Sequence, residues 1–431
     1  MNLGKIYKLL LKQNIGVVDT PVINVSDIVK KGTLIARANG LGADLHSSVC
    51  GKVIKITDSF IDIEEDELGS EEFEPIQEFE RIVDTVKAAG IIGMGGAGFP
   101  TYVKIDTDLK GGTVIANAVE CEPLLKHNIK QVTQDPESIY RGMLYVMKAT
   151  NASKGLLAIK EKNIEAIEAF RKIIKSEDNI EISALEDIYP MGEERAIVRE
   201  TLGVLLKTDQ LPLEENAVVL NVETLSRITQ AVELKKPVIS KNITVVGKLK
   251  SGKQEHVFMD VPLGTTVKEL IERAGVIDGN YGEIIMGGPF TGYSVEVDDV
   301  ITKTSGAIIV TMEFMQEKRN MGLLVCACSA TESRLREIAG KMNAKVVAVE
   351  TCKQAVENKG TLKCEDPGNC PGQAEKILLL KKNGAQVLLI GNCSDCSNTV
   401  MCVAPKLKMP VYHCTDHVMR TVGHSLVRRL K

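Results

Sequence analysis

The sequence contains no tryptophan, and aromatic residues make up only 4% of its 431 residues. Proteins that bind single-stranded nucleic acid stack the bases on aromatic side chains, so this composition argues against that function. There is also no excess of positive charge, since 53 Lys and Arg are opposed by 57 Asp and Glu, for a formal net charge of −4. Nucleic-acid binders need a basic patch, and we therefore expect no nucleic-acid partner.

The chain also lacks long hydrophobic runs, because none approaches the roughly 20 apolar residues that span a bilayer. The N-terminal stretch "MNLGKIYKLLLKQN" has a charge inside its short apolar run and no small-residue cleavage site. We therefore expect no secretory signal and a cytoplasmic location. We interpret this stretch as a helix that caps the first domain. The alternative is a basic amphipathic helix in peripheral contact with a membrane.

Cysteine is scarce over most of the chain, because only Cys50 and Cys121 precede residue 326. The other nine cysteines lie at positions 326, 328, 352, 364, 370, 393, 396, 402 and 414. In a reducing compartment a static disulfide framework is disfavoured, and such a concentration of thiols indicates redox or metal chemistry.

The first 80 residues have the pattern of a small all-β module followed by a linker. Residues 16–63 contain short β-type runs separated by Gly, Asp and Asn turns. The segments "VSDIVKKGTLIA" and "SSVCGKVIKI" resemble the barrel-sandwich hybrid of lipoyl and biotinyl carriers. The corresponding turn, "NGLGAD", lacks the carrier lysine, so we predict a structural module without a swinging arm. The acid-rich residues 64–80 indicate a solvated linker.

The rest of the chain has mixed α/β patterns. Alternating strands and helices predict a parallel sheet between about residues 80 and 240. Two strands, a helix and two more strands over residues 243–312 indicate a β-grasp-like module. From Gly322 onward a strand–helix–strand layout occurs twice. In each copy the first strand ends in two cysteines and the second in one, at the edge where open parallel sheets form their sites.

The glycine-rich stretch "GMGGAGFPTYVK", residues 93–104, formally satisfies the dinucleotide-binding pattern G-x-G-x-x-G. Glu120 also fits the acidic residue expected about 20 positions later. However, a helix pattern precedes the glycines where a strand is required, and Pro100 lies where a long helix should be under way. We therefore do not predict a Rossmann dinucleotide site.

Four segments resemble, in order, the flavin pocket of the NADH-oxidising subunit of respiratory complex I: "GMGGAGFPTYVK", "NAVECEPLL", "YPMGEERAIV" and "VVLNVETLSRI". The resemblance implies FMN and NADH as cofactors, with the glycine loop and a helix N-terminus near the FMN phosphate. The residues that this resemblance assigns to the site are Gly93, Gly95, Gly96, Gly98, Lys104, Asn117, Glu120, Glu122, Gly192, Glu193, Glu194, Asn221, Glu223 and Thr224. Each of them could alternatively serve only to cap a helix, as Glu193 and Glu194 would at a helix start.

Residues 1 to about 315 resemble the RnfC protein of the Rnf electron-transport complex, including "VPLGTTVKELIERAGV" and "IIMGGPFTG" of its β-grasp (SLBB) domain. We thus expect an α/β multidomain protein. Its expected parts are a barrel-sandwich hybrid (1–65), an acidic linker (66–80), a parallel α/β flavin-type domain that binds FMN and NADH (81–240), an SLBB β-grasp domain (241–315) and a cysteine-rich α/β redox domain (316–431).

The C-terminal part departs from that family, because the ferredoxin pattern C-x2-C-x2-C-x3-C-P is absent. We favour redox-active dithiols, with Cys393 and Cys396 as the first pair and Cys326 and Cys328 as the second. The alternative is an iron–sulfur cluster or zinc held by a set such as Cys364, Cys370, Cys393 and Cys396. Inert buried cysteines are the third possibility. We expect His413, His417 and His424 to be surface or helix residues.

An RnfC-like body joined to a cysteine-rich tail resembles the proline reductase-associated electron-transfer proteins of amino-acid-fermenting clostridia, some of which carry selenocysteine. The resemblance implies an NADH-dependent electron-transfer flavoprotein that delivers electrons through its C-terminal cysteines to D-proline reductase or a similar reductase. The alternatives are a cobalamin reductase-like enzyme and a non-catalytic, metal-binding adaptor of the reductase complex. The sequence does not reveal whether one of these cysteines replaces selenocysteine.

Overall fold

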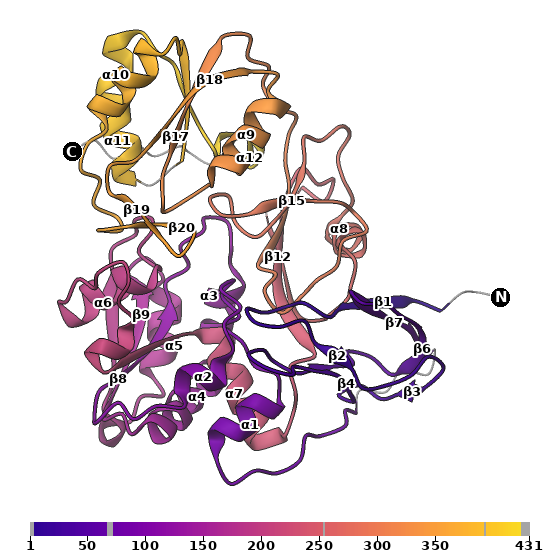
Figure 1. The fold of residues 1–431 in the computed structure, drawn as a ribbon. Coiled ribbons are helices and arrows are strands. Elements are labelled where there is room, and N and C mark those ends of the chain that lie inside the picture. Colours follow the sequence, from indigo (N-terminus) through magenta and orange to yellow (C-terminus); the bar gives the residue numbers. More distant parts are fainter. Residues whose placement is uncertain (1–3, 67–71, 253–254, 392–393, 424–431) are drawn as a thin grey trace.

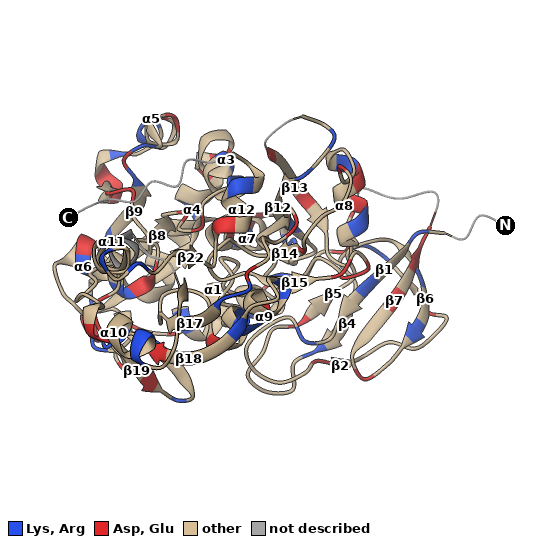
Figure 2. Ribbon diagram, turned by 90° about the horizontal axis from the view of Figure 1, so that it is seen from above, with Lys and Arg blue, Asp and Glu red and all other residues tan. Residues whose placement is uncertain are grey.

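The computed structural model describes residues 4–66, 72–252, 255–391 and 394–423, and these form four successive sheet-containing parts (Figure 1). Lys and Arg are mixed with Asp and Glu on the same elements, for example on α8 (Val267–Ala274) (Figure 2). No helix in the described ranges is both long enough and apolar enough to cross a bilayer.

The first part is all β. One sheet has the order β1 (Ile6–Leu10), β7 (Phe60–Glu65), β6 (Gly51–Ile56) and β3 (Ile28–Val29), and a second has the order β2 (Thr20–Pro21), β4 (Leu34–Arg37) and β5 (Leu45–His46). The predicted N-terminal helix is wrong, because residues 6–10 pair with β7 as an antiparallel strand. Tyr7, Leu9 and Leu11 are buried, so the apolar side chains have the period of two that a strand requires.

The second part is a parallel α/β unit, as predicted. Its sheet has the order β10 (Ile180–Leu185), β9 (Lys154–Lys160), β8 (Thr113–Ala118) and β11 (Ala217–Asn221), and every neighbouring pair is parallel. Its helices are α1 (Ile82–Ala88), α2 (Thr101–Ile105), α3 (His127–Gln134), α4 (Pro136–Thr150), α5 (Ile164–Arg171), α6 (Glu194–Leu202) and α7 (Val222–Leu234). Apolar clusters cover both sheet faces, which explains why β8, β9 and β11 are largely hydrophobic.

The third part is a mixed five-stranded sheet with the order β13 (Glu255–Pro262), β12 (Ser240–Gly247), β16 (Ala307–Val310), β14 (Ile284–Met286) and β15 (Tyr293–Val295). Only the pair β12 and β16 is parallel. Helix α8 packs its apolar face on this sheet. Two strands were expected after the helix, but the structure has three, because the turn at residues 287–292 reverses the chain between β14 and β15.

The fourth part is a parallel sheet with the order β18 (Lys345–Thr351), β17 (Asn320–Val325), β21 (Val387–Ile390) and β22 (Val411–His413). The predicted duplication is confirmed: α9 (Glu332–Lys341) joins β17 to β18, and α11 (Ser394–Val403) joins β21 to β22. Between the two copies lie a hairpin of β19 (Ala355–Asn358) and β20 (Thr361–Cys364), and α10 (Ala374–Lys382). Helix α12 (Asp416–Thr421) follows β22. In Figure 1 the hairpin lies where this part meets the second part.

Both parallel sheets have a topological switch point, where the chain leaves one side of the first strand and continues on the other. In the second part it lies between β8 and β11, and in the fourth between β17 and β21. Crevices at the carboxyl ends of the strands beside a switch point are the usual ligand sites of open α/β sheets. The fold therefore offers two edges at which a site can form.

Candidate functional site

The first edge carries the glycine loop. Residues 93–98 form a turn between α1 and α2, with Pro100 at the N-cap of α2. The Met94 amide donates to Thr224 Oγ1 at 2.9 Å, and that hydroxyl donates to the Ile92 carbonyl at 3.2 Å. Thr224, which is fully buried, thus ties the loop to the start of α7.

The loop is crowded on one side and open on the other. A Cβ added at Gly95 would lie 3.0 Å from Asn221 Nδ2, so the Asn221 side chain would have to shift to admit it. Gly96 has φ +103°, a conformation that favours glycine, and a Cβ there would meet no atom within 4 Å. The geometry is that of a backbone surface that a phosphate-bearing ligand can approach closely.

The residues at the ends of β8 and β11 lie next to this loop. Asn117 and Asn221 are paired across the two strands, and the Asn221 side chain caps α7 by accepting from the Glu223 amide at 2.8 Å. Asn117 Nδ2 donates to the Gly192 carbonyl at 3.1 Å, which joins the third resembling segment to the second. The predicted segments therefore meet at one edge of the sheet.

Lys104 and Glu194 form an ion pair, and Lys104 Nζ also donates to the Val219 carbonyl at 2.8 Å. Both charged side chains are only partly exposed. Glu193 caps α6 by accepting from the Arg195 and Ala196 amides at 2.9 and 3.0 Å. Lys104 therefore joins α2 to both α6 and β11.

Three of the predicted acidic residues have protein partners instead. Glu223 is fully buried with Lys241 and Arg227, and although burial opposes its charge, these cations lower its pKa. Glu122 accepts from the Phe290 amide at 2.8 Å and from the Thr291 amide at 2.9 Å, and burial raises its pKa to about 7. Glu120 accepts from Asn128 at 2.8 Å, and burial raises its pKa as well. The position of Glu223 argues for a structural role in holding α7.

The second edge carries thiols. Cys326, Cys352 and Cys414 directly follow β17, β18 and β22, which confirms the predicted placement at the ends of parallel strands. Cys393 lies outside the described residues, and the side chain of Cys396, in α11, is likewise not among those described. None of the nine described cysteines forms a disulfide. Within the described ranges no three His, Cys, Asp or Glu side chains are arranged to hold a metal ion.

The thiols at this edge differ in their surroundings. The Cys328 thiol lies next to those of Cys326 and Cys364, and this proximity together with burial raises its pKa. The same contact with Cys328 lowers the pKa of Cys364, whose thiolate is also favoured by the Asp366 amide and Arg195. Burial raises the pKa of Cys414 to about 11. Cys364, which was predicted only as an alternative metal ligand, therefore has the most thiolate character of these three cysteines.

One segment, residues 189–195, lies between the two edges. Its Tyr189 stacks on Phe290 with ring centres 3.7 Å apart and donates to the Cys328 carbonyl. Its Arg195 donates to the Cys364 carbonyl. The Gly192 amide of the same segment donates to Cys121 Sγ at 2.7 Å. The segment that carries Gly192, Glu193 and Glu194, which the resemblance assigns to one wall of the flavin site, is therefore also the surface on which the cysteine-bearing part rests. The sequence pattern gave no indication of these contacts.

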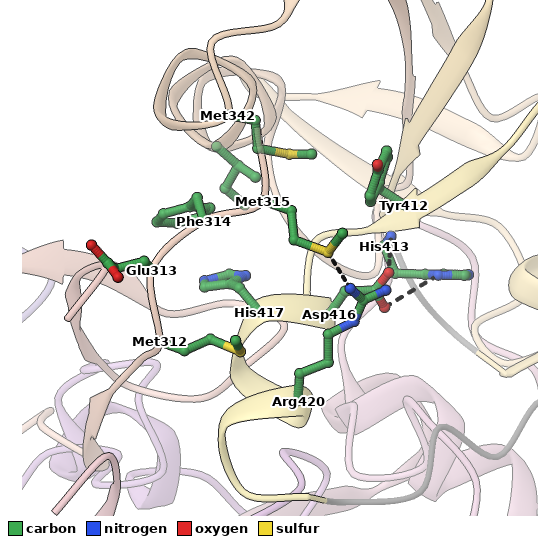
Figure 3. Close-up of a pocket in the computed structure, with 11 residues that line it drawn as sticks. Met312, Glu313, Phe314, Met315, Met342, Tyr412, His413, Asp416, His417 and Arg420 are labelled. Carbon is green, nitrogen blue, oxygen red and sulfur yellow. Dashed lines mark hydrogen bonds and ion pairs between the residues drawn. The ribbon is translucent and has the colours of Figure 1, made fainter. Parts of the chain in front are cut away.

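A hollow lies between residues 312–315 and α12, beside the end of β22 (Figure 3). Met312, Met315 and Met342 line it together with His413 and His417. The expectation of a surface or helix residue is wrong for His413, which is buried at the end of β22. His417 lies in helix α12, as that expectation allowed, but it is buried and its Nε2 lies 2.7 Å from Glu283 Oε1. His424 lies outside the described residues.

Comparison with known proteins agrees with this architecture. Residues 1–67 match the family model for the RnfC barrel sandwich hybrid domain, and residues 86–230 match the model for the Nuo51 FMN-binding domain. The C subunit of the Na⁺-translocating ferredoxin:NAD⁺ oxidoreductase complex of Acetobacterium woodii is 30% identical over 321 residues, covering 70% of this chain and 72% of that protein. The C subunit of the proton-translocating complex of Clostridium ljungdahlii is 32% identical over 321 residues, covering 69% of each.

The chain therefore belongs to the RnfC family of electron-transfer subunits. The cobalamin reductase PduS of Citrobacter freundii is 35% identical over 230 residues, which cover 53% of this chain and 49% of that protein. Among solved structures, an NAD⁺-reducing [NiFe]-hydrogenase in the air-oxidised state matches 54% of this chain and 46% of its own, at 25% identity and a TM-score of 0.46.

Proposed function

We propose that this protein is an NADH-dependent electron-transfer flavoprotein that passes electrons through its C-terminal cysteines to a partner reductase. The observation that carries the proposal is the shared segment 189–195, which contacts both the edge with the glycine loop and the edge with the thiols. The match of residues 86–230 to an FMN-binding domain supports the choice of flavin. The proposed compartment is the cytoplasm, where NADH is available.

The proposed FMN site consists of the glycines at 93, 95, 96 and 98, with Asn117, Gly192 and Asn221 around them. The open side of Gly96 and the tight approach of Gly95 fit a phosphate held by backbone amides. Lys104 would compensate the phosphate charge, with Glu194 holding its ammonium in place. Bound FMN would accept a hydride and release its two electrons singly or together.

Thr224 and Glu193 would position the loop and α6, as their contacts indicate. We assign Glu120 and Glu122 to the nicotinamide side of the site because of the resemblance of their segment to the complex I subunit. We propose the domain boundaries 1–65, 81–240, 241–315 and 316–431, with residues 66–80 as the linker. We assign the third of these domains to the SLBB β-grasp type because of its mixed sheet with one helix.

The proposed partner is D-proline reductase or a reductase of similar chemistry. Its support is the combination of an RnfC-type body with a cysteine-rich α/β tail in which the ferredoxin motif is absent. A cobalamin reductase is the second candidate, supported by the 35% identity to PduS. Anaerobic assays with NADH as donor, and with either D-proline reductase or a cobalamin as acceptor, separate these two functions.

A visible spectrum with metal analysis of the anaerobically purified protein tests the flavin. We expect flavin absorption that bleaches with NADH. Gly96→Ala should weaken flavin binding at least tenfold, because the added Cβ occupies the open approach. Gly203→Ala is the matched control, since Gly203 also has a positive φ and free space for a Cβ but lies at the end of α6. Zinc without flavin would instead support the adaptor, and equal flavin loss in both variants would contradict the proposed cradle.

A further inference from the structure

Three thiols from two separate segments meet at the second switch point. Cys326 and Cys328 follow β17, and Cys364 ends β20 of the hairpin that lies against the second part. The Cys328 thiol contacts both of the others. A bond between Cys326 and Cys328 would close a ring over a single intervening residue, which the Cα and Cβ separations of a disulfide disfavour. The pairing that geometry favours is therefore between Cys328 and Cys364.

The backbones of these two cysteines are held by the same wall. Tyr189 donates to the carbonyl of Cys328 and Arg195 to the carbonyl of Cys364. Arg199, one turn further along α6, pairs with Asp366 and donates to the Pro367 carbonyl at 2.8 Å. The hairpin is thus fastened to the helix that begins at the flavin wall, and both thiols keep their places relative to it.

We propose that Cys328 and Cys364 form the redox-active disulfide that first receives electrons from the flavin edge, in place of the Cys393 and Cys396 pair predicted from the sequence. This inference rests on the proposed function for its reductant, which is NADH acting through the flavin site. Cys328 is half-buried whereas Cys364 is buried, so Cys328 is the sulfur that a partner protein can reach.

The step balances as a two-electron reduction. The sulfur–sulfur bond breaks and two thiols form, with the consumption of two electrons and two protons. One NADH supplies a hydride, which carries two electrons and one proton, and solvent supplies the second proton. In the following exchange the Cys328–Cys364 bond forms again, and a disulfide of the partner opens to a dithiol.

Peptide mapping of the full-length protein tests the pairing without any use of flavin. After oxidation with diamide and alkylation, trypsin should yield residues 320–334 disulfide-linked to residues 364–376. Cys328→Ser and Cys364→Ser should each abolish this linked peptide. Cys326→Ser and Cys370→Ser, which change the other cysteine of each peptide, should retain it. Cys402→Ser is the control for an exposed thiol.

Other linkages overturn the proposal. A disulfide within residues 383–406 as the main product would restore the Cys393 and Cys396 pair. Iron or zinc in the anaerobically purified chain that is lost in Cys364→Ser would show a metal site instead. In flavin-containing protein NADH should open the linkage, and a reduced flavin beside a closed linkage would refute electron entry at this pair. A linked peptide in protein that binds no flavin would support the pair and refute only the proposed function.

Discussion

Replacement of Glu223 by leucine tests the distinction between structural and ligand-binding acids at the glycine loop. Glu223 and Lys241 are both fully buried, and Glu223 also accepts from the Asn242 amide at 2.9 Å. Glu223→Leu leaves the ammonium of Lys241 without its carboxylate, which should cost about 3–5 kcal/mol of unfolding free energy. Lys241→Met should cost a similar amount for the converse reason.

The double variant should be far more stable than the sum of the two single changes predicts. Leucine and methionine fill similar volumes and remove the Glu223–Lys241 pair, while Arg227 keeps Asp260 as its partner. We therefore expect a loss of about 1–2 kcal/mol, mainly from the Asn242 amide. The coupling energy would then exceed about 2 kcal/mol, as for residues in direct contact. Flavin affinity of the double variant should stay within about threefold of the parent.

Urea titrations followed by far-ultraviolet circular dichroism measure these differences, because the chain contains no tryptophan for fluorescence. Hydrogen exchange over α7 reports the same effect locally. Additive costs would refute the assignment of the buried pair. A loss of flavin without a change in unfolding free energy would show that Glu223 contacts the ligand after all.

Three further predictions concern other parts. Burial lowers the pKa of His46 to about 3, so the unfolded state binds more protons than the folded state below pH 6.5, and the unfolding free energy falls as the pH falls. His46→Phe should remove about 2 kcal/mol of the loss of unfolding free energy between pH 7 and 5, measured by urea titration at each pH. An unchanged dependence of the unfolding free energy on pH would contradict this. In stopped-flow assays Tyr189→Leu should slow NADH-driven thiol formation while the rate of flavin reduction stays unchanged. Tyr189→Phe keeps the stacking on Phe290, so its rate of thiol formation should lie between those of the parent protein and Tyr189→Leu. Equal rates in all three proteins would refute the role of segment 189–195. Dialysis against a chelator should leave thiol formation from NADH unaltered, and a loss that zinc or iron restores would favour the metal alternative.

Local patterns were sufficient for most of the fold. The alternation of buried strands with amphipathic helices predicted the parallel sheets, and the cysteines after β17, β18 and β22 followed from strand ends that share one edge. The N-terminal strand was predicted as a helix because the nearly continuous apolar residues of "IYKLLL" fit both the helical and the strand period, and only pairing with β7 selects the extended form.

The contacts that define the two edges could not be predicted from local sequence patterns. Tyr189 and Cys328 are 139 positions apart, and Glu122 and Phe290 are 168 positions apart. Such pairings depend on how whole domains dock, and no periodicity within one segment encodes them. The same reason explains why the sequence predicted Cys364 only as a metal ligand, since its neighbours come from a different strand.

The docking through residues 189–195 also limits how this protein can be divided. Cutting the chain near residue 315 would uncover the stacked rings of Tyr189 and Phe290 and remove the carbonyl that Arg195 contacts. The two rings and the Arg195 guanidinium would then face water, although they are buried in the intact chain. The tail is therefore not an interchangeable module, and replacing it with ferredoxin-type clusters would require redesign of the wall on which it rests.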